Sequence, residues 1–201
     1  MGRGIGTRLV AGGHEIQVLD HDPDEAYALA DELNAQGNGG ARAADGETIE
    51  GDVVILALPY PNLSEALDQY GEQLTGKIIV DITNPIDVST MDRLATPPGV
   101  SAAEEIAQRI RGARVVKAFN TTFAGTLVAG RADGEPLDVL MAGDDREAKE
   151  RVATLVKDGG LRPIDVGPLR RAKQLEHLGL LHITMQDTLG TNYGSAVKLV
   201  W

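Results

Sequence analysis

The run Asp-Val-Val-Ile-Leu-Ala-Leu at residues 52–58 most constrains what this chain can fold into. It ends at Pro59, and a second apolar run at 77–83 ends at Asn84-Pro85, with a helical pattern over 63–74 between the two. Continuous apolar strands of this kind are covered on both faces, as in parallel sheets with helices on each side. The chain is therefore expected to alternate strands with helices.

The same alternation extends along most of the chain and predicts an α/β fold, a Rossmann-type doubly wound parallel sheet. We assign residues 1–167 to this dinucleotide-binding domain. Strands are predicted at 15–20, 41–44, 52–58, 77–83, 114–119, 137–142 and 162–166, and helices at 2–12, 22–33, 63–74, 102–110, 121–127 and 146–157.

The remaining residues, 168–201, carry no strand pattern and are assigned to a small C-terminal helical segment. Five apolar side chains recur there at spacings of three and four, which predicts an amphipathic helix that packs on the sheet or on a second subunit. They are Leu175, Leu178, Leu181, Met185 and Leu189.

Composition excludes several classes of function. The 19 basic and 30 acidic side chains give a net charge of −11, which disfavours nucleic acid and anionic membranes as partners. The chain has no Cys, which agrees with a cytoplasmic location, and its apolar runs are far shorter than the ~20 residues of a membrane helix. Its 24 Gly residues gather at strand–helix junctions, which points to nucleotide binding.

The sequence starts at a helix, whereas a doubly wound sheet starts with a strand and a Gly-x-Gly-x-x-Gly turn. The run Gly2-Arg3-Gly4-Ile5-Gly6 does not satisfy this fingerprint, because Thr7 stands where its last Gly belongs. We expect Gly2 to be the third Gly of the fingerprint and Met1 to be an internal Met of a longer reading frame.

Several blocks in the same order make the chain resemble the NADPH-dependent F420 reductase family, from Gly2 to the closing Lys198-Leu-Val. The resemblance implies hydride transfer between a nicotinamide, NADP(H) or NAD(H), and the deazaflavin coenzyme F420 as co-substrate. It also implies a homodimer, with no catalytic acid, nucleophile or metal. The blocks are 2–15, 52–60, 80–85, 116–123, 142–145, 160–168 and the pairs Leu175-Glu176 and Leu181-His182.

Candidate site residues follow the ends of three neighbouring strands, where open α/β sheets bind ligands. For the nicotinamide nucleotide these are Leu58, Pro59, Tyr60, Asn84, Pro85, Ala118 and Asn120, together with Gly2 and Asp20. For the hydride acceptor they are Phe119, Thr121, Thr122 and, from the family's Leu-His pair, His182.

Each of these residues also has a purely structural interpretation. The prolines are ordinary strand terminators, and Asn120 would cap a short helix. Phe119 and Phe123 are equally suited to core packing. The histidines of the chain are more often structural than chemical, and His182 is kept as a candidate only because the family's Leu-His pair falls there. Asp144-Asp145 and Glu104-Glu105 are interpreted as helix starts.

Asp20 departs from the family, which typically carries small polar and basic residues at this point. A carboxylate that ends this strand binds both ribose hydroxyls of NAD and repels the 2′-phosphate of NADP. We therefore hypothesise weakened NADP selectivity or a preference for NADH. In the structural alternative, Asp22 simply caps the following helix.

Two other functions remain open from the sequence. One is reduction of a small imine or carbonyl, for which Tyr60 or His182 would donate the proton. The other is a nucleotide-binding module without turnover, because a chain that lacks the first strand is expected to bind its cofactor weakly and to be of low stability.

Overall fold

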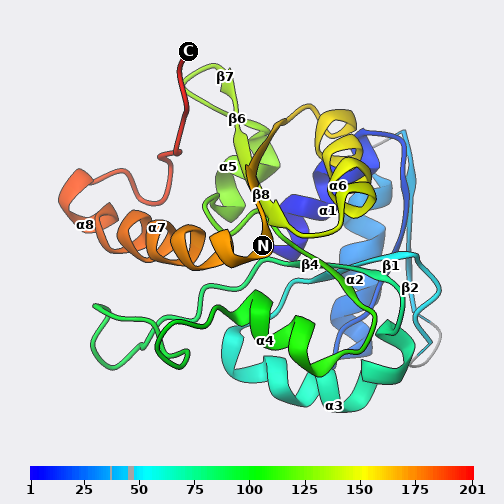
Figure 1. Cartoon of the computed structure of the whole chain (residues 1–201). Helices are drawn as coiled ribbons and strands as arrows, with labels where there is room; N and C mark the ends of the chain where they lie inside the picture. The colour runs from blue at the N-terminus through cyan, green and yellow to red at the C-terminus, as the bar shows by residue number, and fades with distance from the viewer. Residues whose placement is uncertain (37, 45–47) are drawn as a thin grey trace.

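The computed structural model describes residues 1–36, 38–44 and 48–201, and Figure 1 shows its helices packed around a central sheet. The helices are α1 Gly2–Ala11, α2 Pro23–Asn34, α3 Leu63–Leu74, α4 Ala102–Arg109, α5 Ala124–Ala129, α6 Arg146–Asp158, α7 Ala172–Thr184 and α8 Gln186–Leu189, with 3-10 turns η1 Tyr60–Asn62 and η2 Leu169–Arg171. The strands are β1 Glu15–Val18, β2 Gly40–Ala43, β3 Val53–Leu56, β4 Ile78–Asp81, β5 Arg114–Lys117, β6 Arg131–Ala132, β7 Glu135–Pro136, β8 Asp138–Gly143 and β9 Arg162–Gly167.

The sheet departs from the single parallel sheet predicted. Strands β1 and β2 pair in parallel as a separate two-stranded sheet, and the main sheet has the order β3-β4-β5-β8-β9. In the described part of the chain no strand pairs with both β1 and β3, so the two sheets are not joined. As an edge strand, β3 has half-buried Val53, Val54 and Ile55, whereas the sequence predicted cover on both faces.

One strand of the main sheet runs against its neighbour. Strand β8 is antiparallel to β5, although β3, β4, β5 and the pair β8-β9 are otherwise parallel. A parallel crossover needs a helix long enough to return along the sheet, and α5 has six residues, a length of about 9 Å. A short β6-β7 hairpin, absent from the prediction, follows α5 and leads directly into β8.

Helix starts are largely those that the sequence indicates. Asp22 accepts a hydrogen bond from the backbone N–H of Asp24 and caps α2, as its structural interpretation predicted. Asp145 caps α6 through the N–H of Ala148, also as predicted. Helix α5, in contrast, begins at Ala124 after Phe123, so Asn120 is not its cap.

The core lies on both faces of the main sheet. On one face α1 and α6 contribute a cluster that includes Ile5 and Val152, and on the other α3 and α4 contribute one that includes Leu67 and Ile106. The two-stranded sheet has a small cluster of its own around Leu33. These layers of helix, sheet and helix form the predicted α/β architecture.

Two glycines of α1 allow the helix to pack closely on its neighbours. A Cβ at Gly4 would lie 2.7 Å from the Cβ of Leu127 in α5, and one at Gly6 would lie 2.8 Å from Leu33 in α2. A Cβ at Gly2 would meet only Ala57, at an ordinary 3.6 Å. The glycines of α1 at which a side chain would clash are therefore Gly4 and Gly6, which the sequence analysis did not select.

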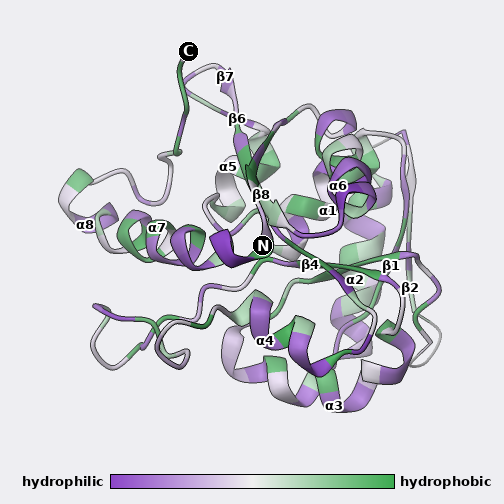
Figure 2. Ribbon diagram, viewed as in Figure 1, coloured by the Kyte–Doolittle hydropathy of each residue, from purple (hydrophilic) through white to green (hydrophobic). Residues whose placement is uncertain are grey.

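Helix α7 buries only part of the apolar stripe that was predicted to pack on the sheet or on a second subunit. Leu175 is buried, but Leu181 is 60% exposed. The buried face instead carries small and polar side chains, and Figure 2 shows hydrophobic and hydrophilic residues alternating along the helix. Besides Leu175, its buried residues are Ala172, Glu176, Gly179 and His182, and Gln186 of α8 is buried as well. The reason lies in what this face contacts, the polar ends of β4 and β5.

Within the described ranges, no helix is both long enough and apolar enough to cross a membrane.

Candidate functional site

The segments that follow β4 and β5 meet through two asparagine side chains. The amide nitrogen of Asn84 donates to the backbone oxygen of Asn120 at 2.7 Å, and the amide nitrogen of Asn120 donates to the side-chain oxygen of Asn84 at 2.9 Å. Adjacent Pro85 and Ala118 are buried. The structure thus brings together the predicted residues of two neighbouring strand ends.

The chain leaves β5 through a strained residue. Phe119 is 3% exposed and has a φ of 61°, a left-handed conformation that is unfavourable for an aromatic side chain. Its backbone oxygen accepts hydrogen bonds from both the N–H and the hydroxyl of Thr122, which hold the turn. Strain of this kind is characteristic of functional sites, and here it orients Asn120 and Thr121.

Helix α7 is docked onto these strand ends. The amide nitrogen of Asn120 also donates to the backbone oxygen of Leu175, at 2.8 Å. One turn further along, a Cβ at Gly179 would overlap the side-chain oxygen of Asn84 and would lie 3.1 Å from the amide nitrogen of Asn120. Only glycine allows α7 to approach the Asn84–Asn120 pair this closely.

A fully buried ionic cluster fastens the same helix to the sheet. The Lys117 ammonium group contacts Asp81 Oδ2 and Glu176 Oε1, both at 2.8 Å, and donates to the Thr83 backbone oxygen at 2.6 Å. Glu176 Oε1 also accepts the N–H of Ala102 at the start of α4. Burial raises the pKa of Glu176, an effect that the nearby Lys117 opposes. The cluster joins β4, β5, α4 and α7.

Several polar atoms around the contact of α7 with the ends of β4 and β5 have no hydrogen-bond partner within the described part of the chain. Unsatisfied buried polar atoms are costly, and they mark places where water or a ligand completes the structure. They are Thr83 Oγ1, Asn120 Oδ1, Thr121 Oγ1, Glu176 Oε2 and His182 Nδ1.

His182 lies inside a polar and aromatic environment at the other end of α7. Its Nε2 is 2.9 Å from the hydroxyl of Ser195, and its ring centroid is 4.3 Å from that of Phe123. Tyr193 meets Phe123 edge to face from the other side. Burial lowers the pKa of His182, which favours the neutral imidazole, and the nearby Thr121 backbone opposes the shift.

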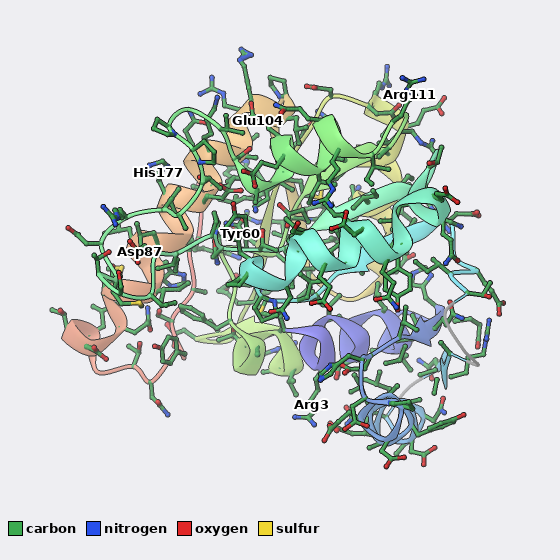
Figure 3. The ribbon with its side chains drawn as sticks, turned by 90° about the horizontal axis from the view of Figure 1, so that it is seen from below. Arg3, Tyr60, Asp87, Glu104, Arg111 and His177 are labelled. Atoms are coloured by element: carbon green, nitrogen blue, oxygen red, sulfur yellow. The ribbon has the colours of Figure 1, made fainter. Side chains whose placement is uncertain are left out.

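The third predicted strand end, after β3, has a different partner. Leu58 is half-buried and Pro59 is exposed, while the Tyr60 hydroxyl donates to Glu105 Oε2 of α4 at 2.9 Å. Burial and the Glu105 carboxylate raise the pKa of Tyr60 to about 12. In Figure 3 Tyr60 lies near the middle of the view, between α3 and α7, while Arg3 lies toward the lower edge, beside α1.

The two remaining predicted residues, Gly2 and Asp20, lie beside the ends of two other strands, β3 and β1. Gly2 starts α1 beside Ala57, at the end of β3. Asp20 follows β1, and its Oδ1 accepts the N–H of Asp22 at 3.1 Å. Within the described residues, no hydrogen bond or ion pair joins the Asp20 side chain to the strand ends of β4 and β5.

Sequence reasoning missed the residues that dock α7. A lysine within the apolar strand Arg-Val-Val-Lys-Ala was a signal, because a buried lysine needs a charged partner. Asp81, at the end of another apolar strand, offered that partner. Glu176 entered the sequence analysis only within the Leu175-Glu176 pair of the family resemblance, without a role, and nothing indicated Gly179, which stands among leucines in a helical pattern.

Comparison with known proteins places this architecture in a family. A family model described as "NADP oxidoreductase coenzyme F420-dependent" matches residues 1–85. The F420-dependent NADP reductase of Methanothermobacter marburgensis is 32% identical over 202 residues, which cover 92% of this chain and 87% of that protein. The chain belongs to the F420-dependent NADP reductase family, as the resemblance in its sequence predicted.

One further comparison agrees with this membership, and another shows similarity to a reductase of a different name. A crystal structure of an Arthrobacter protein, provisionally assigned as an F420-dependent NADP reductase, superposes with a TM-score of 0.78 at 30% identity and covers 98% of this chain and 96% of that one. The Rossmann-type fold is thereby confirmed. The metalloreductase STEAP3 of Rattus norvegicus is 31% identical over 178 residues, 89% of this chain. The chain spans 34% of the length of that rat protein.

Proposed function

We propose that this protein is an oxidoreductase that transfers hydride between a nicotinamide nucleotide and the deazaflavin coenzyme F420. The observation that carries the proposal is the docking of α7 onto the ends of β4 and β5 around the Asn84–Asn120 pair. In a family of F420-dependent NADP reductases, this is where an open α/β sheet binds its ligand.

The unsatisfied atoms of this edge fit the nicotinamide end of the nucleotide. Asn120 Oδ1 is an acceptor and the Thr121 hydroxyl is both donor and acceptor, a set that suits a carboxamide group. At the other end, the Asp20 carboxylate suits ribose hydroxyls, and the N-terminus of α1 suits phosphate oxygens. When bound, the two coenzymes supply the hydride chemistry themselves.

The chain's own residues bind, orient and exclude water. The strained turn at Phe119 fixes the backbone at the end of β5, and the amide pair joins it to the end of β4. Helix α7 covers the edge, anchored by the buried contact of Lys117 with Glu176. Hydride transfer needs two rings held at reacting distance in a dry site, and these contacts provide a rigid wall for one.

The geometry gives less support to reduction of a small imine or carbonyl. That reaction needs a proton donor, and the proton of Tyr60 is bonded to Glu105 with the pKa raised to about 12. The other candidate, His182, is buried and its pKa is lowered, so at neutral pH the ring is neutral and is not in the protonated form that a general acid requires.

The exposed apolar stripe of α7 and α8 supports a homodimer as part of the proposal. Leu181, Met185 and Leu189 are 60%, 37% and 48% exposed. A second copy of the chain would cover them, and light scattering at two protein concentrations tests this. The cytoplasmic location remains a prediction from the sequence.

The function is tested by mixing the protein with F420 and supplying NADH or NADPH. Bleaching of the visible absorbance of the deazaflavin, at a rate proportional to protein concentration, is expected. The variant Gly179→Ala, whose new Cβ would displace α7 from Asn84, is expected to bleach F420 more slowly. Absence of bleaching with either nucleotide, while nucleotide still binds, would favour a binding module or another acceptor.

A further inference from the structure

The unit formed by β1, α2 and β2 is strongly acidic. Residues 15–50 contain ten Asp or Glu side chains and a single Lys or Arg, Arg42. Helix α2 begins directly after this acidic strand end, with Asp24 and Glu25 in its first turn. Because α1 precedes β1, the turn after β1 is where a dinucleotide bound at the N-terminus of α1 places its adenosine ribose.

Asp20 is held in position at this turn. Its Oδ1 accepts the N–H of Asp22 and lies 2.7 Å from His21 Nδ1. The Asp20 side chain is 43% exposed, and no residue in the described ranges bonds to its Oδ2. The carboxylate is therefore oriented by the protein while one oxygen stays available to accept hydrogen bonds from two vicinal hydroxyls.

The cations that would balance a phosphate here are already engaged. The Arg42 guanidinium is 2.5 Å from Glu50 Oε2, and that of Arg3, in α1, is 2.9 Å from Glu32 Oε2 in α2. A 2′-phosphate would bring close to two further negative charges into this unit. Like charges brought together at a binding surface reduce affinity and select against the wrong ligand.

We propose that Asp20 makes this protein select NADH over NADPH. The carboxylate accepts hydrogen bonds from the ribose 2′- and 3′-hydroxyls of NADH, and it repels the 2′-phosphate of NADPH. This inference rests on the proposed function, because it concerns the nucleotide used at the same site. It also departs from the nucleotide that the relatives' names state.

Binding measured without F420 tests the inference. NADH and NADPH are titrated separately into the protein, with nicotinamide fluorescence as the readout, and calorimetry with ADP-ribose and its 2′-phosphate gives an independent value. We expect NADH to bind tighter by about tenfold or more, the ratio that a difference of 1.4 kcal/mol produces.

Two variants and one control sharpen the test. Asp20→Asn removes the charge and should bring the two affinities within about threefold, and Asp20→Ser combined with His21→Arg should invert the preference. Glu65→Gln makes the same change in net charge on the exposed face of α3 and should leave the ratio unchanged. Asp22 is kept, because it caps α2.

Equal affinities, tighter binding of NADPH, or binding of neither nucleotide would overturn the inference. If Glu65→Gln changed the ratio of NADH to NADPH affinity as much as Asp20→Asn does, the inference would also be overturned, because net charge alone would then explain the preference. A clear NADH preference without bleaching of F420 would leave the inference in place and remove the proposed hydride acceptor. If NADPH bleached F420 with a kcat/KM equal to or above that of NADH, the proposed hydride acceptor would stand and the inference about Asp20 would be removed.

Discussion

The two parts of the molecule that would hold the ends of a dinucleotide differ in where their charged side chains lie and in how they are paired. At the ends of β4 and β5, Lys117, Asp81 and Glu176 are fully buried and paired with one another. In the unit of β1, α2 and β2, carboxylates such as Asp20 stand at the surface with few cations near them. In the first region the paired charges fix the position of α7. In the second region the exposed carboxylates would attract or repel an approaching ligand.

This difference predicts where substitutions affect folding and where they affect selectivity. A buried charge stripped of its partner destabilises the fold, while an exposed carboxylate contributes little to stability. Variants of the residues that hold α7 against β4 and β5 should therefore change both the free energy of unfolding and kcat. Variants at Asp20 should alter the choice of nucleotide at nearly constant stability.

Lys117→Met is expected to have the largest effect. It leaves Asp81 and Glu176 buried without their counter-ion, which should lower the free energy of unfolding by about 3–5 kcal/mol in urea denaturation. Lys157→Met, at the exposed end of α6, is the matched control and should change it by less than about 0.5 kcal/mol.

A triple variant separates loss of charge balance from loss of packing. Asp81→Asn and Glu176→Gln added to Lys117→Met remove all three charges, and this combination should recover part of the lost stability. If it were less stable than Lys117→Met alone, unpaired charge would not be the cause.

Gly179→Ala should cost about 1–3 kcal/mol of stability, because the new Cβ overlaps the Asn84 side chain and displaces α7. We expect kcat for F420 reduction to fall with it. Gly125→Ala in α5 meets nothing within 4 Å and should be neutral or raise stability by about 0.5–1 kcal/mol. Equal effects of the two substitutions would contradict the close approach of α7.

The fold was predictable from the sequence to the extent that it depends on local patterns. The apolar strands β4 and β8 and the helices capped by Asp22 and Asp145 follow directly from periodicity and capping residues. The antiparallel direction of β8 did not, because it depends on how far a short helix carries the chain. The separation of β1 and β2 from the main sheet is likewise a matter of long-range pairing.

The sequence predicted which strand ends form the candidate site, but it predicted only some of the contacts made there. Residues at strand ends, such as Asn84 and Asn120, could be found because parallel strands end at a common edge. The face that α7 turns inward could not, since an apolar stripe ordinarily points to the core. Here Glu176 and Gly179 are buried instead, because the surface they meet is polar and close.

Asp22→Ala should have a smaller effect, confined to the nucleotide unit. Loss of the hydrogen bond to the Asp24 N–H should cost about 1 kcal/mol of stability. Asp20→Asn, two residues away, should change the free energy of unfolding by less than about 0.5 kcal/mol and yet alter nucleotide selectivity. If Asp20→Asn were the more destabilising of the two, its role would be structural.

The smallest effect expected is a dependence on pH carried by His182. Burial lowers the pKa of this residue, so below its ordinary value of about 6.5 the unfolded chain binds a proton that the folded chain does not. Stability should therefore fall as pH drops from about 7 to about 5. The fall should be shallower in His182→Gln, as measured by urea denaturation, and equal slopes would show that His182 titrates normally.

The most direct test of the account is to follow the hydride itself. Nicotinamide nucleotide deuterated at its transferable position is mixed with F420 and the protein in ordinary water, and the reduced deazaflavin is analysed by mass spectrometry. A dry site in which α7 closes the edge of β4 and β5 predicts one deuterium in each reduced F420 molecule. Reduced F420 that contains only hydrogen from water would contradict direct transfer at this site.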